Sequence, residues 1–254
     1  MALKRAAVSQ EWRCATGVPG ARSMNIHWAQ EMFDQAGIVR EHVKWDYELR
    51  AASQLESVLD RALAIADTEP KGPVYLTFPR EILAQPAAPL VSPAQAQVGP
   101  ALTGVPDPQG VERIARMLAS ARHPLIITAR AGRNPDAVPL LASLAERYAL
   151  PVVEFRPRYL SLSSEHPMHG GFEVDPWLDE ADAILVLDCD VPWMPGLKAP
   201  RPGVPVIQTG IDPLFGRYPT RGFAADLMLT AEPALLIPAI DAAMQSLVDN
   251  IARG

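Results

Sequence analysis

Short apolar runs and amphipathic stretches alternate along the second half of the chain. Strands that are apolar on both faces and are separated by helices are typical of a parallel sheet covered on two sides. The pattern therefore predicts an α/β fold, a Rossmann-like doubly wound parallel sheet, over residues 107–254. Its strands are expected at 124–129 (PLIITA), 151–155 (PVVEF), 183–187 (AILVL), 205–209 (PVIQT) and, more weakly, 225–229.

Helix boundaries in this half carry signals of their own. Asp107-Pro108 places an N-cap residue before a proline at the first helical position, and the helix is expected to end near His123. Asn134-Pro135 repeats this signal for a helix that ends at Tyr148. A long terminal helix is expected over 233–248.

Residues 25–83 have the pattern of an incomplete α/β fragment. Ser53-Gln-Leu-Glu56 is a capping box before a helix, while 39–45 and 73–79 (PVYLTFP) are typical of short strands. One helix and two strands do not complete a parallel sheet, so this part is expected to be the tail of a domain. Residues 1–24 have no hydrophobic period, which predicts an irregular N-terminus.

A proline-rich linker is predicted between the two parts. The chain has 26 prolines, and seven of them fall between Pro79 and Pro108. Residues 84–106 carry no charged side chain, and proline at this density favours an extended segment over a packed one. We therefore expect the order irregular N-terminus (1–24), fragment (25–83), linker (84–106) and doubly wound domain (107–254).

Composition and charge exclude several classes of protein. Hydrophobic residues make up 48% and charged residues 20%, which are ordinary globular values. A net charge of −6 has the wrong sign for a protein that binds a phosphate backbone, so nucleic acid is not expected as a partner. Cys14 and Cys189 form no disulfide or metal motif, and no apolar run has the length of a membrane span or a secretory signal. We expect a cytoplasmic protein without membrane contact.

Candidate binding residues follow the predicted strands, because ligands of doubly wound sheets lie beyond the carboxyl ends of the strands. Thr128, Arg130 and Gly132 lead from the first strand towards a helix N-terminus, where backbone N–H groups can receive a phosphate. A plain β-to-α turn is the favoured alternative, since no G-x-G-x-x-G occurs. Asp212 in the string GIDP is suited to a ribose hydroxyl, and an Asx-type turn explains it equally well.

Other polar clusters give weaker signals. Asp188 and Asp190 could bind a cation or act as acid and base, but a surface turn after a buried strand is the favoured interpretation. His166 and His169 lie on a predicted loop with no third ligand nearby, so no metal site is predicted. The chain has no G-x-S-x-G, Walker A, H-E-x-x-H or kinase signature, and no catalytic residue is assigned.

Two long segments resemble one enzyme family. Residues 25–83 resemble the end of the pyrimidine-binding domain of thiamine-diphosphate enzymes of the acetolactate synthase and benzoylformate decarboxylase type. Residues 107–240 resemble the central domain of the same family, through PLIITA, EHPMHGG, EADAILVLD and GIDP in that order. The elements that carry the first likeness are Gln30-Glu31, Lys44-Trp45, Arg61-Ala62, Gly72-Pro73-Val74 and Pro79-Arg80-Glu81.

The resemblance implies a function for the complete protein. Such enzymes use thiamine diphosphate and Mg²⁺ to act on 2-keto acids as synthases or decarboxylases, which makes them transferases or lyases, and they form homodimers or homotetramers. It also implies that Gln30 and Lys44 approach the substrate channel. The central domain of such enzymes either binds FAD or ADP or has lost that role, and a bound nucleotide would lie near Thr128, Arg130, Gly132 and Asp212.

The family's early glutamate and its G-D-G metal motif match nothing here, so we expect a partial chain that is inactive alone. The alternative is a non-catalytic nucleotide-binding or scaffolding domain.

Overall fold

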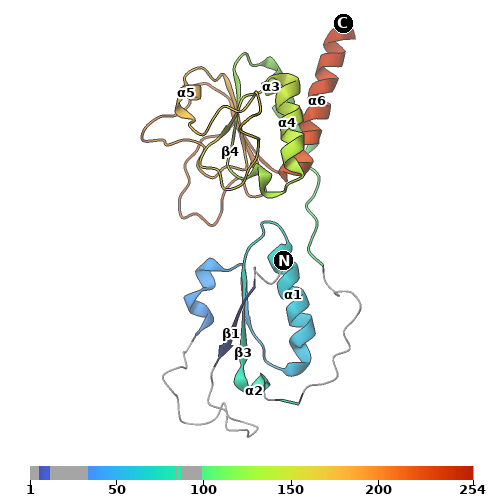
Figure 1. Ribbon diagram of the computed structural model, residues 1–254, viewed down its shortest axis with the longest axis vertical. Coiled ribbons are helices and arrows are strands. Elements are labelled where there is room, and N and C mark those ends of the chain that lie inside the picture. The colour runs from blue at the N-terminus through green and yellow to red at the C-terminus, as the bar shows by residue number, and fades with distance from the viewer. Residues whose placement is uncertain (1–5, 12–33, 84, 87–98, 254) are drawn as a thin grey trace. The chain divides into compact units, whose positions relative to one another are not determined.

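The computed structural model describes residues 6–11, 34–83, 85–86 and 99–253 of the chain (Figure 1). Contacts divide it into two compact units, Met1–Leu102 and Thr103–Gly254. The division falls within the proline-rich stretch where the linker is expected, most of which lies outside the described residues. No helix among the described residues is long and apolar enough to cross a membrane.

The first unit contains a three-stranded parallel sheet in the order β1-β3-β2. Buried side chains of α1, β3 and the neighbouring segments form its core, among them Leu49, Val58, Ala62 and Leu76. Its elements are β1 (Ala6–Glu11), the 3₁₀ turns η3 (Ala36–Ile38) and η4 (Arg40–His42), β2 (Trp45–Glu48), η5 (Ala52–Gln54), α1 (Leu55–Asp67), β3 (Val74–Pro79) and α2 (Arg80–Leu83).

Three expectations for this unit were wrong. Residues 6–11 are not irregular: β1 pairs in parallel with β3, and its sequence AAVSQE gives no strand period of its own. The strand expected at 39–45 begins only at Trp45, after a 3₁₀ turn. Ser53 does not cap α1, because it lies in the preceding 3₁₀ turn and the helix begins at Leu55 without a side-chain cap.

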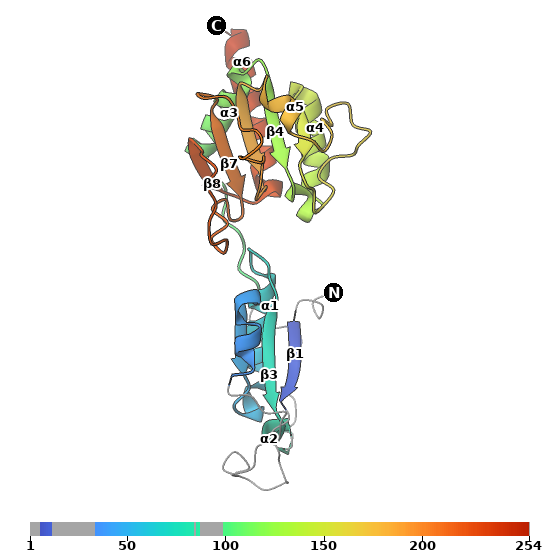
Figure 2. The same ribbon diagram turned by 90° about the vertical axis from the view of Figure 1, so that its left-hand side faces the viewer.

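The second unit contains a five-stranded parallel sheet in the order β5-β4-β6-β7-β8, which confirms the predicted fold class (Figure 2). The cap before α3 is also confirmed, since Asp107 Oδ2 accepts a hydrogen bond of 2.7 Å from the backbone N–H of Gly110. The elements are α3 (Pro108–Ser120), β4 (Pro124–Thr128), η6 (Ala131–Arg133), α4 (Ala137–Tyr148), β5 (Val152–Glu154), α5 (Asp175–Leu178), β6 (Ala183–Leu187), β7 (Val206–Gly210), β8 (Leu227–Thr230) and α6 (Pro233–Arg253).

The two faces of this sheet are covered differently. Helices α3, α4 and α6 pack on one face around residues such as Ile114, Leu141 and Ile240, which are fully buried. The other face is covered by the single-turn helix α5 and by long loops, around Leu178 and Trp193 (Figure 1). Loops replace full helices on this second face, so polar residues of the loops come close to the strand ends.

Candidate functional site

The strand order places a topological switch point between β4 and β6. The chain leaves β4 to form β5 on one side, and later returns to form β6 on the other side. Ligands of open α/β sheets bind beyond the carboxyl ends of the strands at such a point. The residues that follow β4, β6 and β7 are therefore the candidate site.

Asp190 lies three residues after the end of β6 at Leu187, and several polar side chains bind to its carboxylate. Its Oδ2 accepts hydrogen bonds from Arg130 Nη2 at 2.5 Å, from the Tyr218 hydroxyl at 2.6 Å and from Arg158 Nη2 at 3.3 Å. Burial favours the neutral acid, but the Tyr218 hydrogen bond and the charges of Arg130 and Arg158 outweigh it and hold the pKa of Asp190 below its ordinary value. The side chain is thus a buried anion held by groups from three separate segments.

Asp188 is also buried, and its carboxylate pairs with Arg133 at 3.2 Å. It adopts the left-handed region with φ of 48°, which is uncommon for a residue other than glycine. The interpretation of Asp188 and Asp190 as an exposed surface turn was therefore wrong. Their partners lie far away in sequence, after β4, β5 and β7, and only the fold brings them to the end of β6.

The loop after β7 packs aromatic rings against these arginines. Phe215 is buried, with the guanidinium of Arg130 at 5.1 Å from its ring centroid and that of Arg221 at 4.8 Å. Arg221 also lies 5.0 Å from the Phe223 ring and donates from Nε to the carbonyl oxygen of Asp190 at 2.9 Å. Burial lowers the pKa of Arg221. We call Arg130, Arg221, Phe215 and Tyr218, together with Asp190, the arginine–aromatic cluster.

The turn after β4, where a phosphate site was one interpretation, has backbone N–H groups that already donate hydrogen bonds within the domain. The N–H groups of residues 131–133 donate in turn to Thr128 Oγ1, to Ser161 Oγ and to the carbonyl oxygen of Arg130. Thr128 is fully buried. These contacts match the plain β-to-α turn that the sequence left open beside the phosphate interpretation.

Gly132 has a packing reason to be glycine. A Cβ built at this position would lie 1.7 Å from the carbonyl oxygen of Leu160, so only a residue without a side chain lets the two backbone segments pass. The close approach joins the turn after β4 to the loop after β5.

Asp212 bonds within its own loop, but not as an Asx turn, because its side chain accepts from the N–H four residues on and not two. Its Oδ2 accepts a hydrogen bond of 3.0 Å from the N–H of Gly216, and its carbonyl oxygen accepts one from the N–H of Phe215 at 3.1 Å. The carboxylate therefore shapes the loop that carries Phe215.

The two predicted substrate-channel residues belong to the first unit. Lys44 donates from Nζ to the carbonyl oxygens of Ile65 and Thr68 at 2.8 and 2.6 Å, at the C-terminal end of α1. Burial lowers its pKa. Gln30 lies outside the described residues, and the substrate-channel role of both residues stays a prediction.

A second buried polar pair lies at the end of β5. Glu154 accepts a hydrogen bond from the N–H of Ser161 at 2.7 Å, and its other oxygen lies 3.1 Å from Nε2 of His169. His169 is thus part of a buried pair that holds the loop after β5. Among the described residues, no group of three or more His, Cys, Asp or Glu side chains is arranged to hold a metal ion.

Two of the hollows that are lined by described residues lie outside the arginine–aromatic cluster. One of about 330 Å³ lies beside the carboxyl end of β5, between Glu154, Arg158 and the exposed side chains of Tyr159, Leu160 and Phe172.

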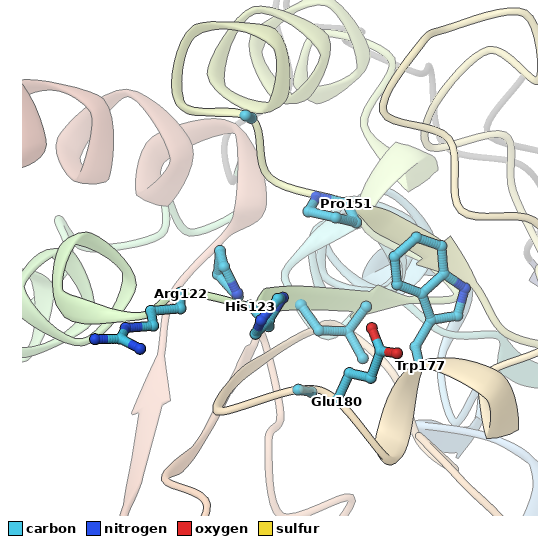
Figure 3. A pocket seen from close by; sticks show the side chains of 9 residues that line it. Arg122, His123, Pro151, Trp177 and Glu180 are labelled. Atoms are coloured by element: carbon cyan, nitrogen blue, oxygen red, sulfur yellow. The ribbon is translucent and has the colours of Figure 1, made fainter.

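The other, of about 110 Å³, lies at the opposite end of the sheet, where β4 and β5 begin. Figure 3 shows Trp177, Glu180, His123 and Pro151 around it, with Arg122 turned away. Because Glu180, His123 and Arg122 are exposed, and because the space is small, this second hollow is not the candidate site.

Sequence reasoning missed most members of the arginine–aromatic cluster. Phe215, Tyr218 and Arg221 lie in a loop without periodicity, and only their spacing in FGRYPTRGF, with aromatic and arginine residues in alternation, could have suggested a common contact.

Comparison with known proteins relates this chain to one enzyme family. Residues 111–231 match the family model described as thiamine pyrophosphate enzyme, central domain. Sulfoacetaldehyde acetyltransferase of Rhodobacter capsulatus is 26% identical over 237 residues, which are 87% of this chain and 39% of that protein. Benzoylformate decarboxylase of Pseudomonas aeruginosa is 27% identical over 216 residues, 80% of this chain and 40% of that protein.

Solved structures agree in fold. A putative thiamin diphosphate-dependent enzyme from Mycobacterium smegmatis superposes with a TM-score of 0.66 at 23% identity, over 80% of this chain and 39% of that one. Benzoylformate decarboxylase from Polynucleobacter necessarius gives a TM-score of 0.65 at 22% identity, over 80% and 38% of the two chains. The chain spans about two fifths of the length of these relatives. The chain is thus similar to thiamine pyrophosphate enzymes, and its residues 111–231 match the central domain of that family.

Proposed function

We propose that the chain is part of a thiamine-diphosphate-dependent synthase or decarboxylase that acts on 2-keto acids, and that it supplies mainly the central domain. The observation that carries the proposal is the central-domain match over residues 111–231, together with relatives named as a decarboxylase, an acetyltransferase and acetolactate synthases. The role of the central domain in this proposal is to support the domains that hold cofactor and substrate.

The described residues do not offer a site for the cofactor's metal ion. The diphosphate of thiamine diphosphate would need oxygen ligands that present Mg²⁺, and within the described ranges no cluster of acidic or histidine side chains is arranged for this. The carboxylates of Asp188 and Asp190 are neutralised by arginines of the same unit. No step of thiamine chemistry is therefore assigned to these residues.

The test has two arms. Calorimetric titration of the purified 254-residue chain with thiamine diphosphate and Mg²⁺ is expected to give no heat of binding at micromolar concentrations. The complete reading frame that contains this sequence is expected to release CO₂ from pyruvate, benzoylformate or another 2-keto acid, with dependence on both thiamine diphosphate and Mg²⁺. A complete frame that releases CO₂ from no 2-keto acid in the panel would contradict the proposal.

A non-catalytic nucleotide-binding or scaffolding domain is the second candidate function. Four arginines near the switch point, at positions 130, 133, 158 and 221, favour an anionic ligand such as ADP or the diphosphate of FAD. The internal hydrogen bonds of the turn after β4 favour a scaffold without a nucleotide. Titration of the chain with ADP and with FAD distinguishes them, since a nucleotide-binding domain should bind one of the two and a scaffold neither.

A further inference from the structure

The arginine–aromatic cluster occupies the place where a doubly wound domain would hold a nucleotide. We propose that residues 212–223 are a built-in plug, which fills the switch point with Phe215 and Tyr218 and thereby takes the position of a bound nucleotide. The inference concerns the central domain alone, and it does not depend on the proposed 2-keto acid activity.

The first argument is that the arginines are already committed. Arg130 contacts Asp190, the Tyr218 hydroxyl and the Phe215 ring together, at 2.5, 3.3 and 5.1 Å. Arg221 lies 4.8 Å from the centroid of the same ring and donates to the backbone of residues 189 and 190. Two guanidinium groups therefore contact one aromatic ring, and a planar heterocycle could make the same contacts.

The second argument is that the backbone N–H groups that would bind a phosphate already donate hydrogen bonds within the domain. The turn donors at 131–133 are bonded within the domain, and the backbone of Leu160 passes at contact distance over Gly132. Asp212, which a ribose would need, accepts from the N–H of Gly216 and so shapes the plug itself. A nucleotide would therefore have to displace several internal contacts at once, each of them satisfied.

The third argument is that the plug is held under backbone strain. Phe215 has φ of 49°, and a bulky residue in the left-handed region costs free energy unless its surroundings hold it there. Phe215 is nonetheless buried, with 8% of its surface exposed, while its neighbour Leu214 is 65% exposed. The contacts of Phe215 in the cluster fix this conformation, and their loss should release the segment.

Two variants and one control test the plug in the full chain. The variant with Phe215→Ala and Tyr218→Phe removes the stacked ring and one hydrogen bond of Asp190. Tyr218→Phe alone is the milder change in case the double variant folds poorly. Leu214→Ala is the control, because it alters an exposed side chain in the same loop.

The first measurement is the rate of tryptic cleavage after Arg221. In the wild type the guanidinium group of this residue lies against the rings of Phe215 and Phe223. We expect a rise of about tenfold for Tyr218→Phe, which corresponds to one hydrogen bond to a charged group, and a larger rise for the double variant. Leu214→Ala should leave the rate unchanged. An unchanged rate in both Tyr218 variants would overturn the proposal.

The second measurement is calorimetric titration with ADP. The wild type is expected to show no binding up to about 1 mM. The double variant is expected to gain binding below about 1 mM, because Arg130 and Arg221 lose the Phe215 ring and can contact the ring of a ligand in its place. Submillimolar ADP binding by the wild type would overturn the plug if ADP leaves the rate of cleavage after Arg221 unchanged. A double variant that is cleaved faster but binds no ADP would also overturn it, since something other than the plug would then exclude the nucleotide.

Discussion

Buried carboxylates at strand ends define this domain at the scale of single residues. Asp190 has 7% of its surface exposed, yet it is ionised because a hydroxyl and two guanidinium groups replace the water it has lost. A buried, paired carboxylate of this kind makes the free energy of unfolding depend on pH and on the presence of each partner side chain. An exposed pair of the same residue types, by contrast, contributes little.

Asp190→Asn should destabilise the chain by about 1.5–3 kcal/mol at pH 7, because charge-assisted hydrogen bonds to Arg130 and Tyr218 are lost. Its lowered pKa fixes the sign of the pH dependence. The stabilisation is present above the ordinary carboxyl pKa near 4 and disappears as the pH falls through the lower pKa of the folded state. The free energies of unfolding of the two proteins should therefore converge below about pH 4.

Denaturant unfolding of both proteins at several pH values measures this difference. Asp179→Asn is the control, because Asp179 is 68% exposed and pairs with Lys198 at the surface. Its effect should stay below about 1 kcal/mol. Equal losses in the two variants would show that the Asp190 cluster contributes no more than a surface pair.

Gly132→Ala should destabilise the chain by about 1–3 kcal/mol or more, because the new Cβ would overlap the carbonyl oxygen of Leu160 and force two backbone segments apart. Gly196→Ala is the matched control, since nothing lies within 4 Å of its added Cβ. The midpoint of thermal unfolding separates the two. A stable Gly132→Ala protein would mean that the loop after β5 can move away without cost.

Local signals decide how much of each element can be predicted. Strands β4 to β7 were found because each is an apolar run that is buried nearly throughout, as in β6, where all five residues are buried. The signal of β8 was weaker, and only one of its four residues is buried. Strand β1 was missed because AAVSQE has no such pattern and its pairing with β3 comes from far along the chain. The same reason hid the site: Asp190 was visible after its strand, but its partners follow β4, β5 and β7.

Helix caps test the local signals directly. Asp107→Ala should destabilise α3 by about 1 kcal/mol, because the hydrogen bond from its carboxylate to the N–H of Gly110 is lost. Asp136→Ala is the control, since Asp136 stands before α4 without a side-chain cap bond. Hydrogen exchange of the first-turn amides of both helices reports the difference. Equal exchange changes in the two variants would show that the cap of α3 adds nothing.

At the scale of the whole molecule, two units with separate cores are joined by a segment without charged side chains. Among the described residues, the sheet of the first unit has three strands and that of the second unit has five. A small sheet with few strands has less core to hold it and more exposed edge than a five-stranded sheet. The first unit is therefore expected to depend on contacts with another chain or another part of the protein.

Limited proteolysis and size measurement test this expectation together. A nonspecific protease such as subtilisin should cut first between Pro86 and Pro106, where proline disfavours regular hydrogen bonding, and release the second unit as a stable fragment. The intact chain should run as a homodimer or larger assembly in light scattering, while the released fragment should run as a smaller species, because the apolar surface that drives association is assigned to the first unit. A stretch that resists cleavage, or a fragment that associates as strongly as the whole chain, would place the association surface on the central domain instead.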